Sequence, residues 1–223
     1  VLFRSDVSRP EWQRDLLDGV TNVDVVSGTL REYPRRVLGR NQRDHKLTYM
    51  YGTVNKLGQP LAINAAWCAE TWSLGADGVV PWQTIGSKDS LTKPDDLAVF
   101  YPGPDGPLPS LRLKAFRAGQ QLTEYLTAYA TTSSQDREAV GAAVLALPGL
   151  RAGTVRTYAD DAGSSAFGDG AARSVAELRL RLGAYLDANF LPPTHERWND
   201  PRPRRVDPAK IAPRTALPAP TFN

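Results

Sequence analysis

Four short apolar segments alternate with helical patterns along the first part of the chain. The apolar segments lie at residues 1–3, 23–26, 47–51 and 79–82. Residues 11–17, 30–38 and 60–74 carry apolar side chains every three or four positions, which is the spacing of an amphipathic helix. We expect Pro34 to interrupt the second of these helices. Strands that alternate with helices predict parallel βαβ units.

The later part of the chain predicts further helices and then an irregular end. Residues 110–129 have a broad apolar face and give the strongest helical pattern. Two more helices are predicted at 135–147 and 175–189, on either side of a Gly/Ser/Ala-rich loop at 163–171. Residues 191–223 are rich in Pro and Arg and have no periodicity, which is typical of a tail. We therefore divide the chain at 1–130, 131–190 and 191–223.

Parallel βαβ units can form a doubly wound sheet or a closed barrel. A glycine-rich phosphate loop after the first strand would favour the doubly wound sheet, and the sequence contains none. The chain also starts with Val1 in an apolar segment and has no initiator Met, so we expect it to be a piece of a longer protein. The predicted fold class is α/β: about four parallel strands forming the second half of a (β/α)8 TIM-like barrel, followed by a helical extension and a tail.

Composition excludes several classes of function. The 223 residues are 41% hydrophobic, enough for a core, and 27 Lys and Arg against 24 Asp and Glu are too balanced to indicate nucleic acid. The single cysteine, Cys68, excludes an intramolecular disulfide and a multi-cysteine metal cluster. No apolar run is long enough to span a membrane. We expect no cofactor and no metal.

A motif in the middle of the chain resembles a known family. The residues are YPG at 101–103, PLPSLRLKAFRAG at 107–119 and EYL at 124–126. They resemble the C-terminal part of the catalytic domain of glycoside hydrolase family 123 and its relatives (domain of unknown function 4091). The resemblance is clearest over residues 47–129 and fainter over 3–28. The chain departs from the family at Leu122 and Thr123, and it contains no adjacent Asp-Glu pair.

The resemblance implies a carbohydrate substrate and a substrate-assisted reaction. In that reaction the acetamide oxygen of a β-linked N-acetylhexosaminide attacks the anomeric carbon, one carboxylate orients the acetamide, and a neighbouring acid protonates the leaving group. The missing Asp-Glu pair would lie upstream of Val1, so we expect this chain alone to be inactive. One alternative is a relative that has lost catalysis and binds carbohydrate or has a structural role. Another is an unrelated doubly wound domain.

The strand ends supply the candidate substrate-binding residues. Trp82 ends the fourth strand and either stacks on a sugar or caps the core. Tyr49 and Tyr51 share one face of the third strand, and Tyr51, nearer the strand end, is the better ligand candidate. Both side chains point either into the barrel or into the helix layer, and for Tyr49 a role in filling a packed layer is slightly favoured.

Two polar residues complete the candidate set. Asp6 shares a face of the first strand with Arg4, which predicts either a pocket carboxylate or a structural ion pair. Asn55 follows the third strand and either binds a sugar hydroxyl or makes a turn. Arg112 and Arg117 lie five residues apart on their helix and cannot share one narrow face, so for both we predict a structural role, tying the helix to the YPG loop.

Overall fold

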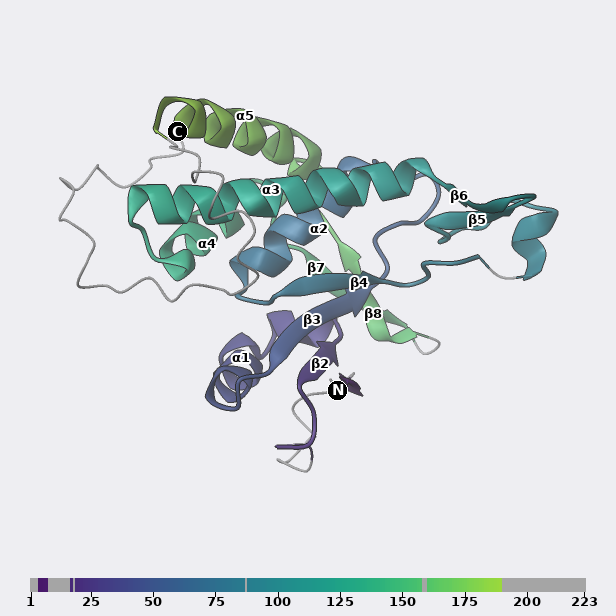
Figure 1. The fold of residues 1–223 in the computed structure, drawn as a ribbon, viewed down its shortest axis with the longest axis horizontal. Helices are drawn as coiled ribbons and strands as arrows, with labels where there is room; N and C mark the ends of the chain where they lie inside the picture. The colour runs from purple at the N-terminus through teal and green to yellow at the C-terminus, as the bar shows by residue number, and fades with distance from the viewer. Residues whose placement is uncertain (1–3, 8–16, 18, 87, 158–159, 190–223) are drawn as a thin grey trace.

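The computed structural model describes residues 4–7, 17, 19–86, 88–157 and 160–189. Four strands between residues 4 and 81 form a parallel sheet, and their spatial order is the order along the chain (Figure 1). Its strands are β1 (Arg4–Val7), β2 (Val23–Val26), β3 (Leu47–Gly52) and β4 (Gly78–Pro81). The predicted α/β class with a parallel sheet is confirmed. Within the described residues the sheet does not close into a barrel.

Two predicted elements and most of a third lie outside the described residues. The apolar segment at 1–3 and the tail at 191–223 lie outside entirely, and of the helix at 11–17 only residue 17 is described. The first strand of the structure begins at Arg4, directly after the predicted segment.

The two faces of β3 differ in what covers them. Thr48 and Met50 are buried, and the Met50 sulfur accepts a hydrogen bond from the indole nitrogen of Trp67 at 3.3 Å. Trp67 belongs to α2 (Ala62–Ser73), so this face of β3 packs on the helices. Because side chains alternate along a strand, Tyr49 and Tyr51 lie on the opposite face, where both are half-buried.

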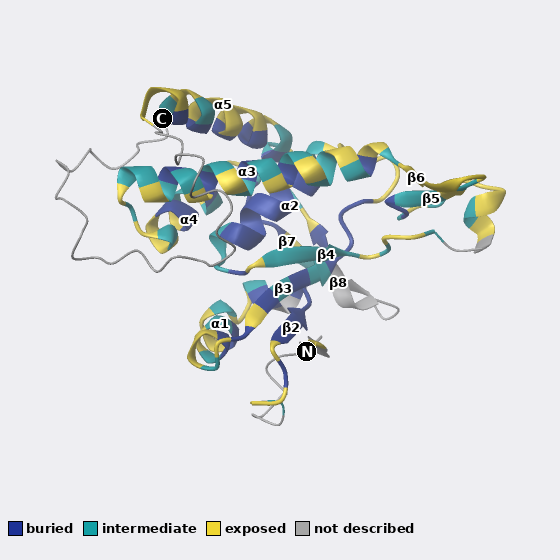
Figure 2. Cartoon of the chain, viewed as in Figure 1, coloured by how far each residue is buried: buried dark blue, intermediate teal, exposed yellow. Residues whose placement is uncertain are grey.

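Helix α2 is the centre of the helical layer. Every residue from 63 to 72 is buried, and the helix contacts the sheet and three other helices, as its position in Figure 2 shows. These are α3 (Leu111–Ser133), α4 (Arg137–Leu145) and α5 (Ala171–Asn189). The side chains of Ser110 and Asp136 cap α3 and α4 by accepting backbone N–H groups. The three predicted late helices are thus confirmed, with shifted ends.

The predicted helix at 30–38 is wrong in its boundaries. The structure has a short 3-10 helix, η2 (Gly28–Arg31), followed by α1 (Pro34–Arg43). Pro34 therefore begins a helix and does not interrupt one. Proline suits the first turn because its missing N–H would have no partner there.

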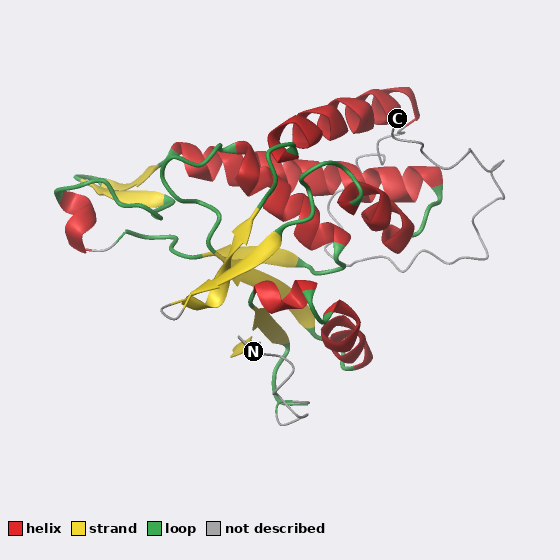
Figure 3. Cartoon of the chain, turned by 180° about the vertical axis from the view of Figure 1, so that it is seen from behind, coloured by secondary structure: helices red, strands yellow, loops and turns green. Residues whose placement is uncertain are grey.

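Two antiparallel hairpins were not predicted. The first is β5 (Phe100–Gly103) with β6 (Gly106–Pro109), and the second is β7 (Gly153–Thr157) with β8 (Asp160–Ala166). Residues 163–166 are therefore strand, residues 167–170 are irregular, and Ala171 already belongs to α5. Figure 3 shows the β7–β8 hairpin crossing the parallel sheet beside η2, and β8 also contacts β3.

A buried ion pair fastens the second hairpin to the helices. Arg31 of η2 donates to both carboxylate oxygens of Glu70 on α2, at 2.8 and 2.5 Å, and to the Ser165 hydroxyl on β8 at 2.8 Å. The Glu70 carboxylate also accepts the Ala152 N–H at 2.8 Å. One pair of charges therefore joins η2, α2 and the hairpin. No helix within the described residues is long and apolar enough to cross a membrane.

Candidate functional site

The carboxyl ends of the four parallel strands define one edge of the sheet, and most of the predicted site residues lie on or near it. Trp82 directly follows β4, and its backbone N–H donates to the Gly52 carbonyl at the end of β3, at 3.0 Å. Its side chain is 58% exposed. A tryptophan that caps a core would be buried, so the indole is available to a ligand.

Tyr49 and Tyr51 share the face of the sheet that the helices leave uncovered. Tyr51 lies one residue before the end of β3, next to Val80 of β4, and Tyr49 lies next to Gly78. A Cβ atom at Gly78 would come within 3.3 Å of the Tyr49 ring, so the glycine allows the ring to lie against the strand. Tyr51 is thus the tyrosine nearer to Trp82 along the sheet.

Asn55 is held inside the protein. It is 2% exposed, its amide nitrogen donates to the Leu97 carbonyl, and its amide oxygen accepts the Val54 N–H at 3.4 Å. The bond to Leu97 joins the loop after β3 to the loop after β4. The amide oxygen keeps acceptor capacity, and the nitrogen is engaged within the protein.

Asp6 pairs in the ladder with Val25, and the position of its side chain lies outside what the structure describes. Arg4 is exposed, so its charge does not need a buried partner such as Asp6. The predicted pairing of these two residues stays a prediction.

Arg112 has the structural role that we predicted, whereas Arg117, for which we predicted the same role, is exposed. The residue is 6% exposed, and its guanidinium donates to the carbonyls of Ala98 at 2.7 Å and Asp95 at 3.0 Å. It thereby ties the first turn of α3 to the segment just before the YPG motif. The hydroxyl of Tyr101, in that motif, donates to the same Asp95 carbonyl at 3.0 Å.

Residues 95–99 are the point at which both site loops meet. The Asp95 carboxylate accepts the N–H groups of Leu97 and Ala98, each at 2.8 Å. The Leu57 N–H, in the loop after β3, donates to Asp96. We call residues 95–99 the loop anchor. Sequence reasoning identified Arg112 through the PSLRL motif, but it missed Asp95, because an Asp in a polar loop has no distinctive pattern.

Several apolar side chains are exposed between β3 and the first turn of α3. Of the twelve large hydrophobic residues that are exposed in the described part of the chain, seven lie in this segment. They are Leu57, Leu61, Trp82, Ile85, Leu91, Leu108 and Leu111.

The described residues contain no group of three His, Cys, Asp or Glu side chains that could hold a metal ion. Cys68 is buried in α2. Burial raises the pKa of its thiol to about 12, so the thiol stays protonated at neutral pH. The side chains described at the strand ends include the aromatic rings of Trp82 and Tyr51.

The chain is similar in fold to a solved glycoside hydrolase, although its sequence matches no known family. No protein-family model matches the sequence, and neither does any curated protein. Among solved structures, the chain is similar to a family 123 glycoside hydrolase from Clostridium perfringens, whose structural analysis concerned glycolipid glycan hydrolysis. The TM-score is 0.52 at 12% sequence identity, over 75% of this chain.

The class that these observations define is a mixed α/β protein with a glycosidase-like fold. The match covers 32% of the Clostridium structure, so this chain spans about a third of that protein. At this level of identity the similarity concerns the fold alone. The residues of the chain must carry any statement about chemistry.

Proposed function

We propose that this chain is the C-terminal half of a (β/α)8 glycoside hydrolase-like barrel that belongs to a longer polypeptide. The observation that carries the proposal is the parallel sheet with sequential strand order, similar in fold to a family 123 glycoside hydrolase. Sequential order is what a barrel requires, because each strand pairs with the next along the chain.

The proposed substrate is a β-linked N-acetylhexosaminide. Active sites of such barrels lie at the carboxyl ends of the strands, which is where Trp82 and Tyr51 are found. An exposed indole offers a flat apolar surface to the apolar face of a sugar ring. In the proposed site Trp82 is the platform, Tyr51 and Tyr49 line the floor, and Asp6 and Asn55 supply polar contacts.

In the proposed reaction the substrate provides its own nucleophile. The acetamide oxygen attacks the anomeric carbon and the glycosidic bond breaks, while a carboxylic acid protonates the leaving oxygen. A second carboxylate orients the acetamide, and water then opens the cyclic intermediate. The two carboxylates would come from the rest of the longer polypeptide, since no Asp-Glu pair occurs in this sequence.

A second candidate function is carbohydrate binding without catalysis. The observation that favours it is the engagement of Asn55 and the loop anchor in contacts within the protein, which leaves an aromatic edge with few polar groups. Such an edge can bind a sugar face without reacting with it.

Saturation-transfer NMR on the chain tests the aromatic platform that both candidates share. Methyl N-acetyl-β-D-galactosaminide and the corresponding glucosaminide are the probes. We expect transfer to the ring protons of at least one probe, and we expect Trp82→Ala to remove it. Leu180→Ala is the control, because Leu180 is 73% exposed on α5, away from the strand ends. Transfer that survives Trp82→Ala would contradict the assignment of the platform.

A further inference from the structure

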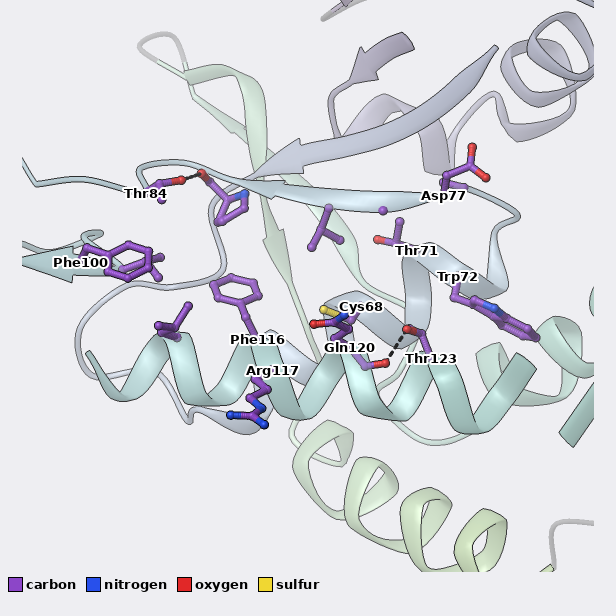
Figure 4. Close-up of a pocket in the computed structure, with 16 residues that line it drawn as sticks. Cys68, Thr71, Trp72, Asp77, Thr84, Phe100, Phe116, Arg117, Gln120 and Thr123 are labelled. Carbon is purple, nitrogen blue, oxygen red and sulfur yellow. Dashed lines mark hydrogen bonds between the residues drawn. The ribbon is translucent and has the colours of Figure 1, made fainter. Parts of the chain in front are cut away.

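The hairpin of β5 and β6 begins close to the aromatic platform, beyond the carboxyl end of β4 (Figure 1). Residues 84–86 run alongside β5. The Phe100 N–H donates to the Thr84 carbonyl at 2.9 Å, and the Gly86 N–H donates to the Phe100 carbonyl at 3.4 Å. Figure 4 shows Thr84 and Phe100 next to each other. Thr84 follows Trp82 by two residues, which span at most about 7 Å, so the base of the hairpin lies near the platform.

One face of this hairpin is apolar and hollowed. Pro102 pairs directly with Pro107, so their side chains share a face, and Phe100, two positions before Pro102, shares it as well. Ile85 forms a bridge with Phe100 and is 72% exposed. Together with Leu91, from the loop after β4, these side chains line a groove of about 590 Å³. We call it the hairpin groove.

The outer edge of β6 presents carbonyl groups without N–H groups at its two prolines. The Ser110 N–H donates to the Val99 carbonyl at 3.0 Å, so these two residues form a hydrogen-bonded pair of the ladder. Alternation then turns the peptide groups of Leu108 toward β5 and those of Pro107 and Pro109 outward. Proline has no N–H, so the outward groups are acceptors only.

An edge of this kind suits a ligand that donates hydrogen bonds. A polypeptide strand added beside β6 would place its own carbonyls opposite Pro107 and Pro109, where no N–H is available, so it would lose half of its ladder. A sugar ring has an apolar face and a rim of hydroxyl groups, each of which can donate. It therefore matches both the apolar floor of the hairpin groove and the acceptor at its rim.

We propose that the hairpin groove binds the second sugar of an oligosaccharide whose first sugar stacks on Trp82. This inference rests on the proposed function, and it narrows the substrate to a glycan of at least two sugars. The second ring lays its apolar face on Ile85 and Phe100, and one of its hydroxyls donates to the Pro107 carbonyl. In the proposed reaction this ring is the leaving group, so the hairpin groove selects the glycan and takes no part in breaking the bond.

Titrations of the 223-residue chain followed by NMR compare one sugar with two. The single-sugar probes are methyl N-acetyl-β-D-galactosaminide and methyl N-acetyl-β-D-glucosaminide. Each has a matching disaccharide, in which the same sugar is β-linked to methyl galactoside. For at least one pair we expect the disaccharide to bind tighter by a factor of roughly 10, which is what one hydrogen bond and one apolar contact add.

Two exposed aliphatic residues on opposite faces of the hairpin give a matched pair of variants. Ile85→Ser removes part of the floor of the hairpin groove, so the disaccharide should bind no tighter than the methyl glycoside. Leu108→Ser is the control, because Leu108 is 52% exposed and alternation places it on the face opposite Pro107. It should leave the tenfold difference in place. Both variants should bind the methyl glycoside as the parent chain does.

The outcomes separate this inference from the proposed function. Equal affinity for the two members of each pair would overturn the second subsite and leave the platform intact. A disaccharide that loses affinity in Ile85→Ser but not in Trp82→Ala would overturn the platform and leave the subsite. Binding of neither kind of probe would overturn both. A dimer in sedimentation that Ile85→Ser disperses would assign the hairpin groove to a second copy of the chain and overturn the sugar assignment.

Discussion

Replacement of Arg112 by methionine isolates what the guanidinium does for the site loops. Methionine keeps an unbranched apolar stem that can pack along the same path, and it removes the donors to the carbonyls of Ala98 and Asp95. A hydrogen bond from a charged group contributes roughly 1.5–3 kcal/mol. Both bonds are lost and two carbonyls remain without this donor, so we expect unfolding to become easier by about 3 kcal/mol or more.

Thermal unfolding measures this change directly. For a domain of this size, each kcal/mol lowers the midpoint by roughly 2–4 °C, which predicts a fall of about 6–12 °C. Arg117→Met is the matched control, because Arg117 lies on the same helix and is exposed. A surface change of that kind should stay within about 0.5 kcal/mol. Hydrogen exchange should also quicken at residues 95–99 in Arg112→Met. If Arg112→Met and Arg117→Met lowered the unfolding midpoint equally, Arg112 would not be the residue that holds the loop anchor to α3.

Three further comparisons test the packing of the fold. Glu70→Gln leaves the buried Arg31 guanidinium without its counter-ion and should lower the free energy of unfolding by roughly 3–5 kcal/mol in urea titrations. Glu177→Gln removes the charge of an exposed i,i+4 pair and should change it by about 0.5 kcal/mol or less. Gly119→Ala should destabilise the protein, because the new Cβ atom would lie 2.7 Å from the Cys68 sulfur. In Gly183→Ala the new Cβ atom on α5 meets nothing within 4 Å, so this substitution should stabilise the protein by roughly 0.5–1 kcal/mol. Burial raises the pKa of the Cys68 thiol from its usual 9.0 to about 12, so the folded chain should lose stability relative to a Cys68→Val variant as the pH rises from 9 toward 12.

The parallel sheet and the central helix were predictable from the sequence because their periodicity is strong. The strand around Met50 alternates in burial, and the helix that contains Trp67 is apolar on nearly every side. The role of Arg112 was also predictable, since Arg112 and Arg117 lie five residues apart on the helix and cannot share one narrow face, which favoured a structural tie over a joint catalytic role. These features depend on local pattern.

The hairpins and the groove were not predictable because they depend on contacts between distant segments. Strand β6 contains two prolines in four residues, and β8 is rich in Gly, Ser and Asp, which are residues typical of loops. The second hairpin is held by the buried Arg31–Glu70 pair, which joins residues 39 positions apart. The proline that begins α1 was misread because Pro34 can start a helix as well as break one.

The central claim is that the chain is the C-terminal half of a glycoside hydrolase-like barrel. The most direct measurement is release of 4-nitrophenol from its N-acetyl-β-D-galactosaminide and N-acetyl-β-D-glucosaminide by the 223-residue chain and by the longer polypeptide, at equal concentrations. We expect hydrolysis of at least one substrate by the longer polypeptide, a lower rate when Trp82 is replaced by alanine, and none by the chain alone. Hydrolysis by the isolated chain, or none by either protein, would contradict it.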